Sequence, residues 1–294
     1  MEKTHKDTLP HCTLLVVMPV GPDDSGADTI ESIFAYCTSS VIILAIDDSK
    51  DAAIRTFLET VDPRVIRLPS AGFRGIRGAL FCSIADAYEY ALQHYSFDVL
   101  LRIDTDALIT GPRPEADAIA TLLQDPSIGM LGSYRYSYEG KRRNFNIVAQ
   151  GMFRETSLLG LSNSTRRKRL NGWIQSAKKY GYERGEHCLG AAIYLRPETL
   201  HAMHAAGDLH VREFHDSVIS EDHLFSLLTI RHGYKLADFV TGDLPMGIQW
   251  RGLPDSPENL LKRGKKIVHS IKFYKDMPQA EIRAYFKKRR PRVH

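Results

Sequence analysis

Apolar residues in the first third of the chain come in continuous blocks separated by polar segments. Three runs, Leu14–Val20, Val41–Ile46 and Val99–Ile103, are each followed by glycine or acidic residues. Continuous runs of this length are typical of strands that are buried on both faces of a parallel sheet. The shorter run Val65–Leu68 predicts a further strand.

The segments between these runs have helical character. Asp28–Tyr36 fits a short helix, and apolar residues recur at helical spacing within Gly75–His94. Pro197–Ala206 starts with proline, and Ser220–Arg231 starts with a serine followed by two acids, as helices often do. This alternation predicts an α/β fold, an open and mostly parallel sheet with helices on both faces.

The middle of the chain, residues 135–184, lacks long apolar runs and is rich in Lys, Arg, Gly, Ser and Asn. We expect loops and a mobile segment there. The last basic cluster, Lys287–Arg290, has two interpretations. It is either a solvated tail or a peripheral membrane contact with anionic lipid.

The composition excludes several classes of protein. With 294 residues, 43% hydrophobic, and 39 Lys+Arg against 35 Asp+Glu, the chain is not collagen-like, disordered or a disulfide-rich miniprotein. The mixed charges argue against a nucleic-acid partner. Four distant cysteines without a C-x-x-C pair are expected to be buried and reduced: Cys12, Cys37, Cys82 and Cys188. A polar start and short apolar runs predict a cytoplasmic protein, or one at the inner face of a membrane.

Carboxylates follow two of the three clear strands. Asp104-Thr105-Asp106 comes directly after Val99–Ile103, and Asp47-Asp48 follows Val41–Ile46. Ligands of open α/β sheets bind at the carboxyl ends of the strands. Two carboxylates there suit Mg²⁺ or Mn²⁺, which prefer oxygen ligands. A D-x-D sequence alone also fits a solvated turn, but its place after a buried strand favours a metal site.

These motifs resemble the GT-A-fold nucleotide-sugar glycosyltransferases. Pro19 after the first strand, Asp47-Asp48-Ser49 and Asp104-Thr105-Asp106 are most similar to the large, mostly inverting family that includes many bacterial polysaccharide transferases. That family often carries G-x-x-x-A-R-N before a helix. Here Gly72–Gly78 keeps the glycine and Arg77, but has isoleucine and glycine in place of Ala and Asn.

The resemblance implies roles for particular residues. The expected donor-binding residues are Pro19, Val20, Asp47, Asp48, Arg77, Asp104 and Lys272. The expected ligands of Mn²⁺ or Mg²⁺ are Asp104, Asp106 and the late His269. Asp222 maps onto the catalytic base, with Glu221 as the neighbour that orients the acceptor. Acids at a helix start also complement the helix dipole, and His269 also fits a structural histidine.

The resemblance predicts metal-dependent transfer of a sugar from a nucleotide-diphosphate sugar, with UDP expected, to a hydroxyl acceptor with inversion. The acceptor is a saccharide, a lipid-linked sugar or another hydroxyl compound. One alternative is a nucleotidyltransferase that makes nucleotide sugars, but its loop after the first strand is normally basic, whereas Gly21–Gly26 is acidic. Another is a noncatalytic nucleotide-sugar-binding protein of the same fold.

Five histidines between His201 and His223 do not fit a zinc-enzyme spacing, so we expect them to be scattered and exposed. The whole chain is predicted to be one catalytic domain. Its expected parts are a donor half (1–110), an acceptor half (111–275) and a basic tail (276–294).

Overall fold

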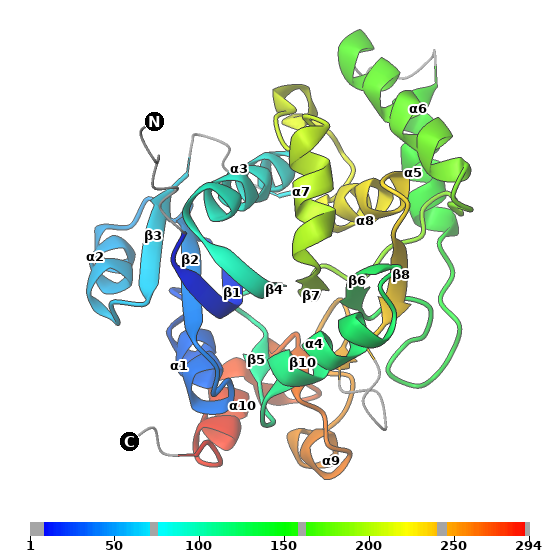
Figure 1. Cartoon of the computed structure of the whole chain (residues 1–294). Helices are drawn as coiled ribbons and strands as arrows, with labels where there is room; N and C mark the ends of the chain where they lie inside the picture. The colour runs from blue at the N-terminus through cyan, green and yellow to red at the C-terminus, as the bar shows by residue number, and fades with distance from the viewer. Residues whose placement is uncertain (1–8, 71–75, 158–162, 240–245, 292–294) are drawn as a thin grey trace, which may run out of the picture.

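The computed structural model of the chain describes residues 9–70, 76–157, 163–239 and 246–291. Its centre is a seven-stranded sheet with the strand order β3-β2-β1-β4-β7-β6-β8 (Figure 1). The strands are β1 (His11–Val20), β2 (Val41–Asp47), β3 (Val65–Pro69), β4 (Ser96–Ile103), β6 (Ile128–Gly132), β7 (Ala192–Leu195) and β8 (Lys235–Asp238).

Neighbouring strands in this sheet are parallel, except that β7 runs antiparallel to both β4 and β6. The predicted mostly parallel α/β sheet is therefore confirmed. The four predicted strands correspond to β1, β2, β3 and β4. Because β1, β2 and β4 are parallel neighbours, their carboxyl ends lie together at one edge of the sheet.

Helices cover both faces of the sheet, as predicted (Figure 1). Successive residues of β1 alternate between two cores: Leu15 and Val17 belong to one, and Leu14 and Val16 to the other. The first core includes side chains from α3 (Gly78–His94), α7 (Pro197–Ala205) and α8 (Glu221–Arg231). The second includes side chains from α1 (Ala27–Tyr36), α2 (Ala52–Thr60) and α4 (Pro114–Gln124).

The prediction of loops in residues 135–184 was wrong, because two helices occupy much of this segment. They are α5 (Asn146–Thr156) and α6 (Ser164–Lys178), and residues 158–162 lie outside the described ranges. Helix α6 buries Leu170, Trp173 and Ile174. These residues form one narrow stripe on a helix otherwise dominated by charge, so no continuous apolar run marks it in the sequence.

Smaller elements complete the carboxyl edge of the sheet. A three-stranded sheet has the order β5-β10-β9, and β11 pairs with β12. Their bounds, with those of the last two helices, are β5 (Leu108–Ile109), β9 (Met246–Ile248), α9 (Pro257–Lys262), β10 (Ile267–His269), β11 (Phe273–Tyr274), β12 (Met277–Pro278) and α10 (Gln279–Lys287). Within the described ranges, no helix has the length and apolar character needed to cross a membrane.

The expected basic tail and its membrane contact are not supported, because this segment is folded through residue 291 and α10 lies against α1. The Arg290 side chain is only 7% exposed and forms ion pairs with Asp28 at 2.5 Å and Glu31 at 3.1 Å. Lys287 pairs with Glu31 at 2.8 Å. Acids of α1 therefore pair with Lys287 and Arg290, two of the four charges that suggested a lipid contact.

These ion pairs between α10 and α1 predict that Arg290 and Lys287 contribute differently to the free energy of unfolding. Arg290→Ala should lower the free energy of unfolding in urea by about 2 kcal/mol, because the nearly buried Asp28 loses one of its two guanidinium partners and keeps Arg283. Lys287→Ala is the matched control: its side chain is 61% exposed, so its loss should cost about 0.5 kcal/mol or less. Equal effects of the two substitutions would contradict a stabilising, buried ion pair between Arg290 and Asp28.

Candidate functional site

The Asp104-Thr105-Asp106 turn is held rigidly at the end of β4. The Asp104 amide donates to the Ala191 carbonyl at 3.0 Å, and the Ala107 amide donates to the Asp104 carbonyl at 3.1 Å. The buried Thr29 hydroxyl of α1 donates to the carbonyls of Thr105 and Ala107, each at 2.8 Å. Hydrogen bonds with the segment before β7 and with α1 therefore fix the backbone around the two carboxylates.

The small sheet brings His269 to this turn. Pairing of β10 with β5 places Val268 opposite Leu108, so the next residue, His269, lies beside the aspartates. His269 Nε2 is 3.2 Å from Asp106 Oδ1 and 4.0 Å from Asp104 Oδ2. Its Nδ1 lies 2.8 Å from the Gln249 carbonyl, which accepts the Nδ1–H and leaves Nε2 facing the carboxylates.

One ligand atom from each of Asp104, Asp106 and His269 lies within 4.8 Å of the others. Two carboxylates and an imidazole with a fixed ring orientation can hold a divalent cation. We call these residues the Asp104–Asp106–His269 cluster. The structure thus brings together the three predicted metal ligands.

Charges around the cluster favour an ionised Asp106. Burial by itself would raise the pKa of this carboxyl, but hydrogen bonds from His269 and Ser270, with the charges of His269 and Lys272, hold it well below its usual range. Lys272 Nζ lies 3.3 Å from Asp106 Oδ2, and the Ser270 hydroxyl donates to the same oxygen at 2.7 Å. Conversely, although burial lowers the pKa of His269, its interactions with Asp106 raise it overall.

A buried arginine joins this cluster to the start of α8. Arg102, on β4, is 3% exposed, and one of its terminal nitrogens lies 2.9 Å from Asp104 Oδ1 and 2.9 Å from Glu221 Oε1. Its other terminal nitrogen donates to the Gly190 carbonyl. Burial, with the charges of Asp222 and Asp104, raises the pKa of Glu221 to about 8 even though Arg102 opposes the shift.

Asp222 is bound on two sides by backbone amides. Gly190 N donates to its Oδ2 at 3.1 Å, and His223 N donates to its Oδ1 at 2.9 Å. Glycine is required at 190 because an added Cβ would lie 2.9 Å from Glu221 Oε1 and 3.1 Å from Asp222 Cβ. Burial would raise the pKa of Asp222, but the nearby His223 and His187 lower it overall, so a charged carboxylate is favoured.

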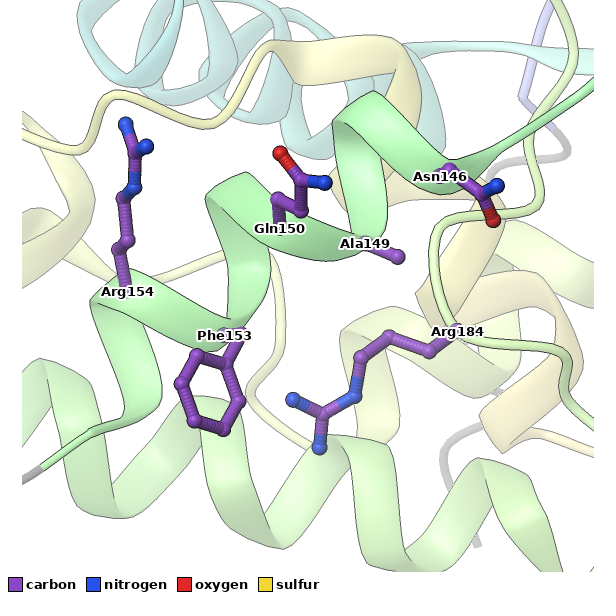
Figure 2. Close-up of a pocket in the computed structure, with 6 residues that line it drawn as sticks. All are labelled: Asn146, Ala149, Gln150, Phe153, Arg154 and Arg184. Atoms are coloured by element: carbon purple, nitrogen blue, oxygen red, sulfur yellow. The ribbon is translucent and has the colours of Figure 1, made fainter.

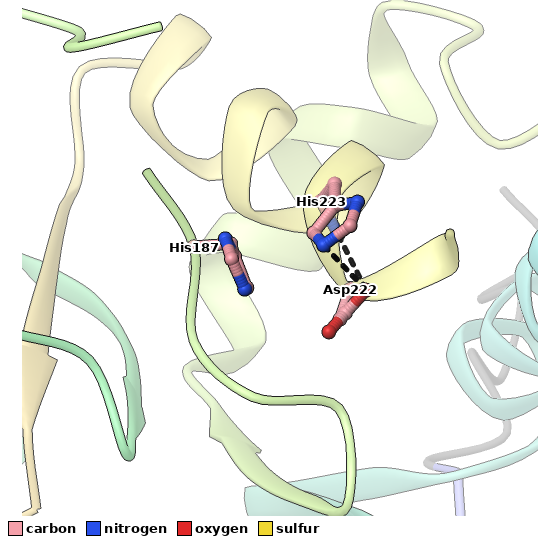
Figure 3. A group of neighbouring side chains, drawn as sticks. All are labelled: His187, Asp222 and His223. Atoms are coloured by element: carbon pink, nitrogen blue, oxygen red, sulfur yellow. Dashed lines mark hydrogen bonds and ion pairs between the residues drawn. The ribbon is translucent and has the colours of Figure 1, made fainter. Parts of the chain in front are cut away.

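His187 and His223 flank Asp222 (Figure 3). With Asp222 they form a second group whose ligand atoms lie within 4.8 Å of one another. However, a terminal nitrogen of Arg143 lies 2.7 Å from His187 Nε2, and the burial of His187 lowers its pKa to about 4. Because a guanidinium already occupies this side of the imidazole, the Asp104–Asp106–His269 cluster is the better fit for a divalent cation.

The predicted donor-binding residues of β1 and β2 also lie at the carboxyl edge. Val20 pairs with Asp47, and the Asp48 amide donates to the Val20 carbonyl at 2.9 Å. The Asp47 carboxylate is buried and accepts hydrogen bonds from Arg67 at 3.2 Å and from the Ser49 hydroxyl at 2.7 Å. Pro19 and Val20 end β1, so their backbone lies beside the same edge.

The structure says less about two other predicted features, the motif that contains Arg77 and the N-cap residue Ser220. Arg77 is exposed at the start of α3 with φ 62°, and it has no ion pair with any residue that the structure describes. The preceding part of the motif, Gly72–Gly75, lies outside the described residues. Ser220 is the N-cap residue of α8, as predicted, but its side chain makes no capping hydrogen bond.

Sequence reasoning missed Arg102, Gly190 and His187 as parts of the site. A single arginine within an apolar strand was a usable signal, because a buried charge needs partners. No local pattern marked Gly190 or His187, whose positions beside Asp222 come from the path of the segment before β7. His223 was expected to be a scattered histidine, but it contacts Asp222.

No family model and no curated protein matches the sequence. Solved structures are similar in fold. A structure of WbbM, a bifunctional glycosyltransferase, has a TM-score of 0.50 and 13% identity over 95% of this chain, which spans 50% of the WbbM chain. An active-site mutant of LgtC has a TM-score of 0.50 and 12% identity, covering 95% of this chain and 97% of LgtC. These likenesses confirm the predicted GT-A-type fold.

The bridging position of Arg102 leads to a stability prediction. Arg102→Met keeps the volume but leaves two carboxylates without their shared cation, so the free energy of unfolding in urea should fall by about 3–5 kcal/mol. Arg55→Met is the control, because Arg55 is 54% exposed and reaches Asp47 only at 4.0 Å. An effect of Arg102→Met no larger than that of Arg55→Met would show that the bridge does not hold the site together.

Proposed function

We propose that this protein is a metal-dependent glycosyltransferase that moves a sugar from a UDP-sugar to an acceptor hydroxyl. The observation that carries the proposal is the meeting of Asp104, Asp106 and His269 at the carboxyl edge of the sheet, with Asp222 near them across Arg102. The fold shared with two glycosyltransferases supports it. A nucleotide-sugar donor and a hydroxyl acceptor are the substrates that this arrangement suits.

The residues of the Asp104–Asp106–His269 cluster fit Mn²⁺ or Mg²⁺. Carboxylate oxygens are their usual protein ligands, and the fixed His269 Nε2 adds a third donor that Mn²⁺ accepts more readily than Mg²⁺. When bound, the ion supplies positive charge to the departing diphosphate. Lys272 is 66% exposed on a flexible stem, so it can leave Asp106 and bind the same diphosphate.

The donor nucleotide is proposed to lie along the ends of β1 and β2. The backbone at Pro19 and Val20 frames the base, and Asp48 accepts a hydrogen bond from the base or ribose. Asp47 is proposed to hold the end of β2, next to Asp48, through its hydrogen bonds with Arg67 and Ser49. Arg77, exposed at the start of α3, supplies a further charge for the diphosphate.

Asp222 is proposed to act as the general base. The acceptor oxygen attacks the anomeric carbon, the bond from that carbon to the diphosphate breaks, and the hydroxyl proton passes to Asp222. Two backbone amides keep this carboxylate oriented, and its lowered pKa keeps it unprotonated before the reaction. General-base catalysis of this kind is worth about 10²–10⁴-fold. Glu221, bound to Arg102, fixes the start of α8 and helps to orient the acceptor.

A direct attack of this kind inverts the anomeric configuration. Inversion is therefore part of the proposal, and the anomeric configuration of the product tests it independently of the other parts. A product that retains the donor's configuration would overturn the role of Asp222 as a base for direct attack, while leaving donor binding intact.

Metal-dependent donor binding can be measured by calorimetry with UDP, in Mn²⁺ and in EDTA. We expect Mn²⁺ to tighten UDP binding, and Asp106→Asn to weaken the Mn²⁺-dependent binding by at least about 10–100-fold, because a carboxylate ligand is lost. Asp117→Asn on α4 removes a carboxylate that pairs with Lys266 and should leave binding unchanged. UDP binding that is insensitive to Mn²⁺, or tighter binding of UTP plus a sugar 1-phosphate, would contradict the proposal.

The base assignment can be tested with the isosteric change Asp222→Asn. Transfer, followed by product mass in a screen of donors and acceptors, should fall about 10²–10⁴-fold. UDP–Mn²⁺ affinity should stay within about twofold, because Asp222 belongs neither to the Asp104–Asp106–His269 cluster nor to the proposed donor-binding residues. Asp216→Asn removes an exposed carboxylate nearby in sequence and serves as the control. Unimpaired transfer by Asp222→Asn would disprove this role.

A further inference from the structure

Positive charge in this chain is concentrated in one segment. Residues 141–184 contain 11 Lys and Arg but only 2 Glu, whereas the rest of the chain contains 28 Lys and Arg against 33 Asp and Glu. The net charge of +4 therefore comes entirely from this segment. Such an asymmetry raises the local concentration of anionic ligands.

A pocket of about 660 Å³ lies in this segment, a size that is common for small-molecule sites. Figure 2 shows that successive turns of α5 contribute most of the lining, and that Arg184 extends from the segment that follows α6. The lining residues are Asn146, Ala149, Gln150, Phe153, Arg154 and Arg184.

The chemistry of this lining is suited to a charged sugar. Phe153 is 63% exposed and offers an apolar ring, while the amides of Asn146 and Gln150 can hydrogen-bond to hydroxyls. Arg154 and Arg184 supply guanidinium groups that bind carboxylate or phosphate with paired hydrogen bonds. No acid belongs to the lining as described.

The two glutamates of the segment do not neutralise these arginines. Glu155 pairs with the buried Arg166 at 2.9 Å, and Glu183 pairs with Arg135 at 2.5 Å. Among the residues that the structure describes, none forms an ion pair with Arg154 or Arg184. Both charges are therefore available to an anionic ligand.

The pocket is connected to the proposed catalytic base by a short segment, 184–190. Gly185 lies against α5, where an added Cβ would be 2.7 Å from the Ala149 amide, and Gly190 donates to Asp222. Six residues span at most about 20 Å. A saccharide of a few units can therefore place one residue in the pocket and a hydroxyl near Asp222.

We propose that this pocket binds an acidic residue of the acceptor saccharide, one that carries a carboxylate or a phosphate group. The proposal rests on the proposed function, because it assigns the acceptor class of the same transfer reaction. A saccharide is favoured over an anionic membrane because the two arginines, the amides and the phenyl ring line one open pocket, whereas a membrane needs only an exposed basic face.

The test measures binding of three trisaccharides to the full chain by calorimetry: one with uronic acids, one with a phosphate group, and the neutral parent. We expect at least one anionic trisaccharide to bind 10-fold or more tightly than the neutral one. Arg154→Gln combined with Arg184→Gln should remove this preference, and Phe153→Ala should weaken binding of the anionic compounds. The two anionic compounds distinguish carboxylate from phosphate recognition.

Lys168→Gln is the matched control, because it removes an exposed charge of α6 outside the pocket and should leave trisaccharide binding unchanged. Vesicles of phosphatidylcholine and phosphatidylserine (3:1) supply the membrane comparison. Two results with the unmodified protein would overturn the proposal: equal affinity for neutral and anionic trisaccharides, or no trisaccharide binding at millimolar concentration. Two results with the variants would also overturn it: an equal loss of trisaccharide binding with Lys168→Gln, or a double variant that loses only vesicle binding. UDP–Mn²⁺ binding, measured in the same variants, reports separately on the proposed function and should not change.

Discussion

The guanidinium of Arg102 is the constraint on which the rest of this site depends. A cation inside an apolar strand cannot stay unpaired, because removing it from water costs several kcal/mol. Arg102 meets this requirement by binding Asp104 on one side and Glu221 on the other, with the Gly190 carbonyl as a third acceptor. The turn after β4, the start of α8 and the segment before β7 must therefore meet at one point.

This convergence gives two pairs of acids, Asp104 with Asp106 and Glu221 with Asp222, different electrostatic environments. On one side of Arg102, His269 and Lys272 keep Asp106 charged, as a cation ligand needs to be. On the other side, burial and neighbouring acids raise the pKa of Glu221, while His223 and His187 keep that of Asp222 low. Arg102 contacts Asp104 of the first pair and Glu221 of the second. Asp106 and Asp222 are the members to which the metal-binding and proton-transfer roles are proposed.

The periphery of the molecule supports the same arrangement. Arg283 of α10 donates to the Thr105 carbonyl at 3.3 Å and pairs with Asp28 at 3.1 Å, so the C-terminal helix reaches the turn that carries Asp104 and Asp106, two of the proposed metal ligands. Opposite charges are also separated in space. Acids are concentrated at the strand ends, and the basic α5–α6 segment presents the arginine-lined pocket at the far end of residues 184–190. The proposed donor site and the proposed acceptor pocket therefore differ in charge.

The sequence by itself determined the parts of the protein that depend on near neighbours. The apolar runs predicted β1, β2 and β4, the acids after them predicted the carboxyl-edge site, and the acids at 221 and 222 predicted the start of α8. It failed for α6, whose apolar stripe is narrow among charges, and for Lys287–Arg290, which resembles a solvated tail until α1 is placed beside it. Only the tertiary structure decided which groups meet in three other cases: Arg102 with Glu221, Arg290 with Asp28, and His187 with Asp222. These partners are far apart in the chain, and local periodicity carries no information about them, because their pairing follows from strand order, register and the need of buried charges for partners.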